Sequence, residues 1–318
     1  MTVVLVIGAN GYTGTPIVHS LLEHGMKVEV LAQQKSLRDP TKRLQFDAFK
    51  AKGAGIRVGS IQDLDSVKQA LIGVDIVISC VVYGYLLEQI PLARLCKDAG
   101  VKRFVPSDFS TYCPPNVMAL QDKKYMVHKA IKEMGLPYTF INSGSWYEVL
   151  LREIDGTPMD PVPSDFKPDL NFRTYGDGHC LNASTDLPEV GELVARIVVD
   201  PRTLNQSVFI CGDALSITQM ADIYESVTKR KLKKTKMDEA RHLSRIQELR
   251  NQIGPLDKNP ELPRELLLRE YGLSRWIRGD NDPSKLPSSI MKASDLYPDF
   301  KFKKWETWMK ERFNASKL

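Results

Sequence analysis

Residues 3–18 read VVLVIGANGYTGTPIV and contain glycines at positions 8, 11 and 14. The unbroken apolar run before Gly8 is typical of a strand buried on both faces, and helical spacing follows Gly14. A strand, a glycine turn and a helix in this order predict a dinucleotide-binding unit. Gly8 permits the tight turn, Gly11 lets the backbone approach a pyrophosphate, and Gly14 allows the helix to pack closely on the strand.

The residues after the second predicted strand, KVEVLA, indicate which dinucleotide binds. A site for NAD places Asp or Glu there to accept a hydrogen bond from the ribose, whereas this chain continues QQKSLRDPTKR. A carboxylate would repel a 2′-phosphate and this basic cluster would attract one, so we predict NADPH as the cofactor. The residues expected to contact it are Gly8, Ala9, Asn10, Gly11, Tyr12, Thr13 and Gly14 of the turn, then Gln33, Lys35, Lys42 and Ser143.

The remaining sequence predicts the fold class. Short apolar strands alternate with helical stretches from residue 2 to about residue 145, which favours an α/β fold with a doubly wound parallel sheet, the NAD(P)-binding Rossmann architecture. The 318 residues exceed a typical single domain. We therefore predict a Rossmann domain over 1–152 and a smaller, mostly helical, substrate-covering lobe over 153–318, with about 186–213 returning to the main sheet.

Composition excludes several other classes. The chain is 42% hydrophobic and 26% charged with a net charge of +5, which is ordinary for a globular protein. The basic run KRKLKKTK at 229–236 is more typical of a solvated helix end or loop than of a nucleic-acid site. We also find no run of about 20 apolar residues, no signal-peptide pattern and no close pair among five cysteines. We expect a cytoplasmic monomer or homodimer with reduced thiols, no metal site, and no membrane or nucleic-acid partner.

The stretch KKYMVHK at 123–129 contains two competing signals. One is Tyr125-x-x-x-Lys129, the tyrosine–lysine pair of short-chain dehydrogenases. Helical phase puts both residues opposite the apolar face of this helix, so we expect both to face solvent and the motif to be accidental. That apolar face, which is expected to turn inward, consists of Val127, Ala130, Ile131 and Met134.

The second signal is the pair Lys123 and Lys124, which falls near the apolar side of the same helix. Periodicity does not choose between the two lysines. A lysine is costly to desolvate, so one that points inward at the carboxyl end of a sheet is a functional candidate. The alternative is that both amines reach solvent along apolar stems.

Five ordered motifs carry a resemblance to a known family. They are IGANGYTG, VKRFVPSDF, KKYMVHKAIKEMGLPYTFI, DPRTLN and LYPDFKF, and they span nearly the whole chain. Together they resemble the isoflavone reductase family, which includes phenylcoumaran benzylic ether, pinoresinol–lariciresinol and eugenol-forming reductases among the NmrA-like atypical short-chain dehydrogenases. The resemblance implies an NADPH-dependent oxidoreductase that acts on a small aromatic or conjugated substrate of secondary metabolism.

The resemblance also implies roles for single residues. The family lysine that serves as general acid and base matches Lys124, the basic residue four positions later matches His128, and the motif serine matches Ser107. The family arginine that contacts the 2′-phosphate is replaced by Gln33, and the glycine that ends its serine motif is replaced by Ser110.

The expected substrate pocket lies at the strand ends of the sheet. We expect its walls to include Tyr83, Phe109, Trp146 and Tyr147.

The alternative function is that of a sensor. Some NmrA-like proteins bind NADP(H) as sensors without turning it over. Because such sensors commonly lack the inward lysine, Lys124 favours an enzyme.

Overall fold

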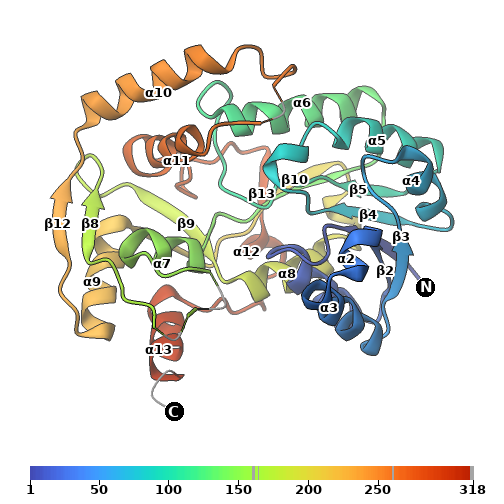
Figure 1. Cartoon of the computed structure of the whole chain (residues 1–318), viewed down its shortest axis with the longest axis horizontal. Helices are drawn as coiled ribbons and strands as arrows, with labels where there is room; N and C mark the ends of the chain where they lie inside the picture. The colour runs from blue at the N-terminus through green and yellow to red at the C-terminus, as the bar shows by residue number, and fades with distance from the viewer. Residues whose placement is uncertain (160–161, 164, 260, 316–318) are drawn as a thin grey trace.

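The computed structural model describes residues 1–159, 162–163, 165–259 and 261–315. Its central feature is a parallel sheet in the strand order β3-β2-β1-β4-β5, shown on the right of Figure 1. This order reverses direction between β1 and β4, the arrangement that leaves a crevice at the carboxyl ends of the strands. The five strands are β1 (Val3–Ile7), β2 (Lys27–Ala32), β3 (Gly55–Val58), β4 (Ile76–Ser79) and β5 (Arg103–Val105).

Later strands extend this sheet beyond β5. A parallel bridge between Phe104 and Tyr138 links β5 to β6 (Thr139–Asn142). Strand β10 (Gln206–Phe209) pairs in parallel with β6, and β13 (Ile290–Lys292) pairs in parallel with β10. The return of β13 was not predicted, because the sequence from residue 216 onward was expected to be mostly helical and outside the sheet. The domain boundary near residue 152 stays a prediction.

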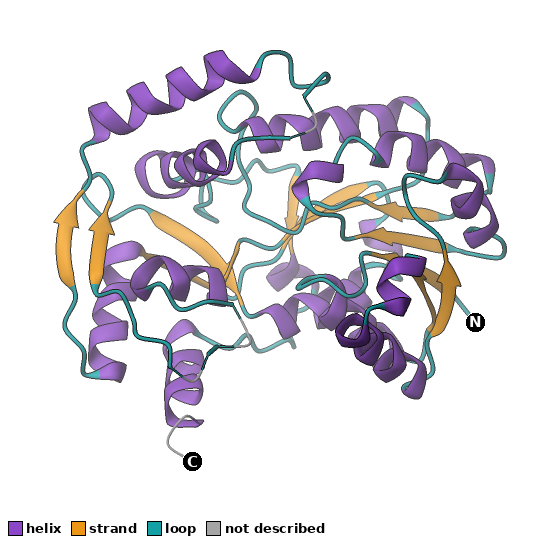
Figure 2. Cartoon of the chain, viewed as in Figure 1, coloured by secondary structure: helices purple, strands orange, loops and turns teal. Residues whose placement is uncertain are grey.

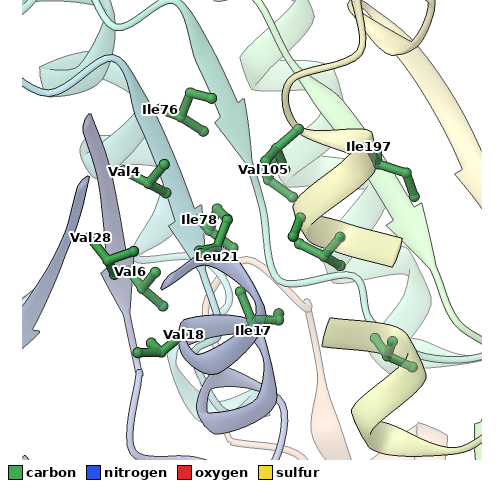
Figure 3. Close-up of a cluster of buried hydrophobic side chains, with 14 of the residues drawn as sticks. Val4, Val6, Ile17, Val18, Leu21, Val28, Ile76, Ile78, Val105 and Ile197 are labelled. Carbon is green, nitrogen blue, oxygen red and sulfur yellow. The ribbon is translucent and has the colours of Figure 1, made fainter. Parts of the chain in front are cut away.

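Helices cover both faces of the sheet, which explains its continuous apolar strands. Figure 3 shows one side of this core, where Val4, Val6 and Val28 of the strands pack against α1. The helices on this face are α1 (Gly14–Glu23), α3 (Pro40–Ala51) and α8 (Leu187–Ile197), with the short α2 (Gln34–Arg38) beside them. The opposite face carries α4 (Leu64–Ala70), α5 (Gln89–Asp98) and α6 (Ala119–Glu133).

The second lobe combines helices with two small sheets (Figure 2). Strands β7 (Ser145–Trp146), β9 (Leu181–Thr185) and β11 (Asp213–Ser216) form one sheet, and β8 (Asn171–Thr174) with β12 (Lys233–Lys236) forms the other. Its helices are α7 (Tyr147–Asp155), α9 (Ile217–Thr228), α10 (Glu239–Ile253), α11 (Arg264–Gly272), the π-helical η3 (Leu273–Arg278), and α13 (Trp305–Ala315). Short turns η1 (Tyr83–Tyr85), η2 (Pro201–Thr203) and α12 (Ala293–Leu296) complete the elements.

Two C-terminal predictions can be compared with this lobe. Trp305, Trp308 and Met309 of α13 are buried against the body, as their shared helical face predicts. The basic run 229–236 was expected to be a solvated helix end or loop. The lysines at 233, 234 and 236 are exposed as expected, but residues 233–236 form strand β12, which pairs with β8, and charges on such a strand discourage edge-to-edge pairing. No helix in the described part of the chain is long and apolar enough to cross a membrane.

Helix α11 of the second lobe holds the start of α6. The residue before α6, Met118, makes no side-chain cap to the helix. Glu270 of α11 is fully buried and takes that role, since it accepts hydrogen bonds from the Ala119 N–H at 2.8 Å and from Arg250 Nε at 2.6 Å. The two helices are thereby fixed to each other.

Candidate active site

The glycine turn after β1 has the geometry that its sequence predicts. Gly8 has a φ of +75°, and a Cβ there would lie 2.4 Å from the carbonyl oxygen of Cys80. A Cβ on Gly14 would lie 2.2 Å from the carbonyl oxygen of Gly8. A Cβ on Gly11, in contrast, would meet only one atom within 4 Å, the Gly8 oxygen at 3.3 Å. Gly8 and Gly14 are thus required by packing, whereas the space beside Gly11 is open. We call this open space at Gly11 the cradle.

A cleft of about 330 Å³ opens beside this cradle, at the carboxyl ends of β1, β2 and β4. Of the residues predicted to bind cofactor, it is lined by Gly8, Asn10, Gly11, Gln33, Lys35 and Lys42. No carboxylate occurs among the described residues that line it. The cleft therefore lies at the switch point of the sheet and is electrostatically suited to an anion.

The residues around the cleft fit a dinucleotide with a 2′-phosphate. Thr13, which precedes α1, makes no side-chain cap, so an anion can occupy the helix N-terminus. Lys35 and Lys42 are exposed at the rim, where their charges cost little. The Gln33 amide donates to Ser60 Oγ at 3.4 Å, so this side chain is held beside the cleft but supplies no charge to it.

A second hollow, of about 330 Å³, adjoins the cleft and shares Gly11, Cys80, Val81 and Val82 with it. We call it the lysine cavity because Lys124 lies in its wall. Its lining is mainly apolar and includes Tyr83, Leu86, Phe109, Leu120, Trp146, Leu267 and Tyr271. Three of the four predicted pocket walls, namely Tyr83, Phe109 and Trp146, come together here.

Lys124 presents a nearly buried amine to this cavity. The residue is 6% exposed, and its Nζ donates to the backbone carbonyl of Asp108 at 2.7 Å and to Ser110 Oγ at 2.5 Å. Burial lowers the pKa of Lys124 from 10.5 to about 8, and the negative charge of Asp108 opposes part of that change. The amine is therefore close to the pH range in which it can both give and take a proton.

The neighbouring Lys123 is also buried but has a different environment. It is 1% exposed, and its Nζ donates to the backbone carbonyl of Asn259, in the segment between α10 and α11. Helical phase placed both lysines near the apolar side, and both side chains are buried. Of the two, Lys124 lines the cavity, and it is the lysine that the family resemblance implies.

Tyr125 does not lie in the cavity, although the prediction that it faces solvent is wrong. The side chain is partly buried, and its hydroxyl donates to the backbone carbonyl of Cys113 at 2.6 Å. The chain between β5 and α6 folds over this side of the helix, which phase alone does not reveal. Lys129 is exposed as predicted, and its Nζ lies 3.8 Å from Glu133 Oε1.

His128 contacts Asp108, the residue whose carbonyl holds the Lys124 amine. Its Nε2 lies 2.6 Å from Asp108 Oδ2, and the side chain of Asp108 is 1% exposed. The imidazole also stacks on Phe140, with ring centroids 3.7 Å apart. The pair fixes Asp108, whose carbonyl oxygen holds the Lys124 amine.

Ser107 lines the cavity, but its hydrogen bonds are made to neighbouring protein groups. Its N–H donates to Gln89 Oε1 at 2.8 Å, and its hydroxyl donates to the carbonyl of Val81 at 2.8 Å. Ser107 therefore ties the segment after β5 to the segment after β4, at the boundary between the cleft and the cavity.

Three predicted site residues are buried and line neither the cleft nor the lysine cavity. Tyr147 is fully buried against Trp305 and Trp308, and its hydroxyl donates to the Lys303 carbonyl, so its assignment as a pocket wall is wrong. Ser143 is fully buried and accepts from the Trp146 indole at 3.3 Å, so it supports a wall of the cavity. The Ala9 side chain is buried beneath the glycine turn.

The remaining turn residues border the hollows from the outside. Tyr12 and Thr13 line the lysine cavity, and Tyr12 is 51% exposed.

Sequence reasoning did not assign a site role to Asp108, Ser110, Leu267 or Tyr271. The first two stand beside Ser107 in a motif and could have been proposed from that position. Leu267 and Tyr271 belong to α11, whose approach to α6 has no local sequence signal.

A parallel sheet with a glycine turn, an anion-suited cleft and a desolvated lysine next to it defines a dinucleotide-binding α/β protein of the Rossmann class. The model of the NmrA-like family matches residues 1–309, so the chain belongs to that family. The resemblance to isoflavone reductase-like proteins is confirmed by the relatives described next.

Among its relatives is an asnovolin J 5′,6′-dehydrogenase from Aspergillus novofumigatus, 32% identical over 97% of this chain and 94% of that protein. A phenylcoumaran benzylic ether reductase from Pyrus communis is 28% identical over 94% of each chain. A leucoanthocyanidin reductase from Vitis vinifera, solved with NADPH, has a TM-score of 0.80 and 26% identity, and covers 97% of this chain and 98% of that one. A structure of AtPrR2 with NADP⁺ and (+)pinoresinol has a TM-score of 0.79 and 26% identity, over 98% of this chain and 98% of that chain.

Proposed function

We propose that the protein reduces a small aromatic or conjugated substrate held in the lysine cavity, and that Lys124 is the general acid and base. The observation that carries this proposal is the buried Lys124 amine, with a pKa lowered to about 8, in the wall of a hollow that adjoins the dinucleotide cleft. Because a proton donor works best when its pKa lies near the operating pH, this environment suits the lysine to proton transfer.

The oxidoreductase class and the NADPH cofactor predicted from the sequence agree with the relatives, which include the leucoanthocyanidin reductase solved with NADPH. The cleft residues that would hold it are the backbone of the glycine turn, with Lys35 and Lys42 toward the 2′-phosphate. When bound, NADPH supplies the hydride. The protein supplies the proton and a cavity from which apolar side chains exclude water.

The lining of the cavity indicates the substrate class. Tyr83, Phe109 and Trp146 supply aromatic side chains to the wall, and its polar groups Ser107, Ser110 and Lys124 come from the loop after β5 and from α6. This distribution suits a mainly apolar molecule with an oxygen directed at the polar part of the wall. Its volume of about 330 Å³ matches a small aromatic molecule. The phenolic ligand in the AtPrR2 structure is of this kind.

The test compares Lys124→Ala with Tyr125→Phe. NADPH oxidation is measured with (+)-pinoresinol and with a panel of aromatic enones such as chalcone, and NADPH binding is followed by fluorescence. We expect Lys124→Ala to lower turnover by roughly 10²- to 10⁴-fold while NADPH still binds. Tyr125→Phe should remain within about twofold of wild type, because its hydroxyl contacts a backbone carbonyl outside the cavity.

Two results would contradict this proposal. A Lys124→Ala variant with wild-type turnover would remove the lysine from the mechanism. Tight NADPH binding by wild type, without turnover of any member of the panel, would favour the NADP(H)-sensing alternative.

A further inference from the structure

Ser110 is the hydroxyl closest to the proposed acid and base. Its Oγ accepts a hydrogen bond from Lys124 Nζ at 2.5 Å. The residue follows β5 in the loop that leads to α6 and lines the lysine cavity. This contact is specific to a chain with a hydroxyl at position 110, where the motif it resembles ends in glycine.

The two partners of Lys124 differ in what they can do with a proton. The carbonyl oxygen of Asp108 accepts a hydrogen bond but has no proton to pass on. The Ser110 hydroxyl can accept a proton from the amine and release its own. Of these two contacts, only the one to Ser110 can therefore extend proton transfer beyond the lysine.

Tyr271 stands next along this path. It extends from α11 into the wall of the same cavity, which Ser110 also lines, and the Ser110 hydroxyl lies near enough to the phenol to oppose the rise in its pKa. Burial raises the pKa of Tyr271, while Arg275 and Ser110 oppose that change, so the phenol keeps its proton at neutral pH. The Arg275 guanidinium lies 5.2 Å from the ring centroid and its Nε donates to the Tyr271 carbonyl at 3.2 Å, which fixes the tyrosine in place.

We propose that Ser110 and Tyr271 extend Lys124 into a proton relay that ends at a substrate oxygen in the lysine cavity. Ser110 is its positioning residue and Tyr271 its terminal donor. This inference rests on the proposed reduction.

Each step of the relay conserves protons and electrons. An N–H bond of the Lys124 ammonium breaks as Ser110 Oγ takes the proton, and the Ser110 proton moves to the Tyr271 oxygen. The Tyr271 phenol proton forms the new O–H bond of the substrate. Lys124 is left as a neutral amine, and both electrons of the reduction arrive with the hydride. Solvent then returns one proton to the lysine.

Charged and titratable groups border the relay on several sides. Asp108 and His128 lie at the lysine end. Arg275 lies at the tyrosine end, where its guanidinium bonds Glu153 at 2.5 Å, and the Cys113 thiol is also near Tyr271. Because the variants described next leave all of these groups in place, their effects report on the relay.

The test uses Ser110→Ala, Ser110→Thr and Tyr271→Phe. Kinetics are measured with an aromatic enone that wild type reduces, under saturating NADPH. Ser110→Ala and Tyr271→Phe should lower kcat by about 10-fold or more with little change in KM, because relay groups act on the proton and not on apolar binding. Ser110→Thr keeps the hydroxyl and should restore most of the rate.

A second readout needs no turnover. The pKa of Lys124 is measured by NMR on protein labelled with ¹³C-lysine and assigned with Lys124→Met. Ser110→Ala removes a partner of the ammonium, so it should lower this pKa by roughly half a unit to one unit. Tyr271→Phe should leave it unchanged within error, because the phenol does not contact the amine directly.

The outcomes separate the relay from the proposed function. If Lys124→Ala is inactive while Ser110→Ala and Tyr271→Phe turn over like wild type, the relay is wrong and the proposed function stands. If Ser110→Ala and Ser110→Thr are impaired equally, Ser110 acts through packing and the relay is also wrong. If Lys124→Ala keeps its activity, the proposed function itself fails.

Discussion

The cofactor cleft and the lysine cavity are neighbours of similar size, yet they use positive charge in opposite ways. In the cleft, Lys35 and Lys42 stand exposed at the rim, where water stabilises their charges. In the cavity, Lys124 is 6% exposed and burial destabilises its charge. The first arrangement attracts an anion and the second prepares an amine for proton transfer. The two hollows should therefore respond to different substitutions.

Apart from Lys124→Ala, the largest effect is expected from filling the cradle at the cleft. Gly11→Val should weaken NADPH binding roughly 100-fold, because its side chain would occupy the space through which a pyrophosphate approaches the helix N-terminus. The apo variant should fold, since a Cβ at Gly11 meets only the Gly8 oxygen at 3.3 Å. Fluorescence titration and thermal unfolding check both statements.

Gly14→Ala serves as the comparison for that variant. Its Cβ would lie 2.2 Å from the Gly8 oxygen, so it should lower the melting temperature where Gly11→Val does not. Unchanged NADPH affinity in Gly11→Val would show that the cradle is not the phosphate site.

The next effect concerns stability and its dependence on pH. The drop in the pKa of Lys124 from 10.5 to about 8 corresponds to a cost of about 3 kcal/mol below pH 8. Lys124→Met should therefore raise the free energy of unfolding at pH 7 by roughly 2 kcal/mol, once the loss of two hydrogen bonds is subtracted.

The sign of the pH dependence follows from proton counts. Between about pH 8 and 10.5 the unfolded chain binds more protons at this lysine than the folded chain, so wild type gains stability as pH rises through that window. The advantage of Lys124→Met should shrink accordingly. Urea unfolding at pH 7 and pH 10 measures it, and an advantage that is constant or grows with pH contradicts a destabilised ammonium.

A smaller effect is expected from the cations at the rim. The double variant Lys35→Ala and Lys42→Ala should lower the preference for NADPH over NADH by about 10-fold, because two charges that attract the 2′-phosphate are lost. Lys50→Ala is the matched control, since Lys50 is exposed at the end of the same helix as Lys42, α3. If NADH and NADPH binding weaken equally in the double variant, the two lysines do not read the 2′-phosphate.

The smallest effect is expected at Asp108. Its carboxylate raises the pKa of Lys124 against burial, so Asp108→Asn should lower that pKa further below 8. If the ammonium is the acid, reduction should be independent of pH below the pKa and should slow above it. This decline should begin about half a unit lower in the variant. Asp98→Asn, at the exposed end of α5, should not move the pH profile, and an identical profile for Asp108→Asn would exclude the carboxylate's influence.

Local pattern was enough to predict the cleft but only part of the cavity. The glycine turn and the missing carboxylate after β2 are short-range signals, and the structure brings these residues together. Helical phase also placed Val127 and Ile131 in the core and Lys123 and Lys124 inward. Phase left the choice between the two lysines open and the family resemblance implied Lys124. The structure supplies the physical difference, since Lys124 meets the carbonyl of Asp108 and Lys123 that of Asn259.

The errors have the same physical origin. Tyr125 was expected in water because its face of α6 is polar, yet the carbonyl of Cys113 lies over it. Tyr147 was expected in the pocket because it follows a strand end, yet the chain turns there into α7 and buries the ring against α13. Tyr271 was missed because α11 reaches the cavity through tertiary packing that no short sequence window contains.

A crystal structure of the protein with NADPH tests the central claim most directly. We predict the dinucleotide along the cradle of Gly11 with its nicotinamide at the boundary of the two hollows, Lys124 facing that ring across the cavity, and Tyr125 still bonded to the Cys113 carbonyl. A nicotinamide beside the Tyr125 hydroxyl, with Lys124 turned away from it, would contradict the account.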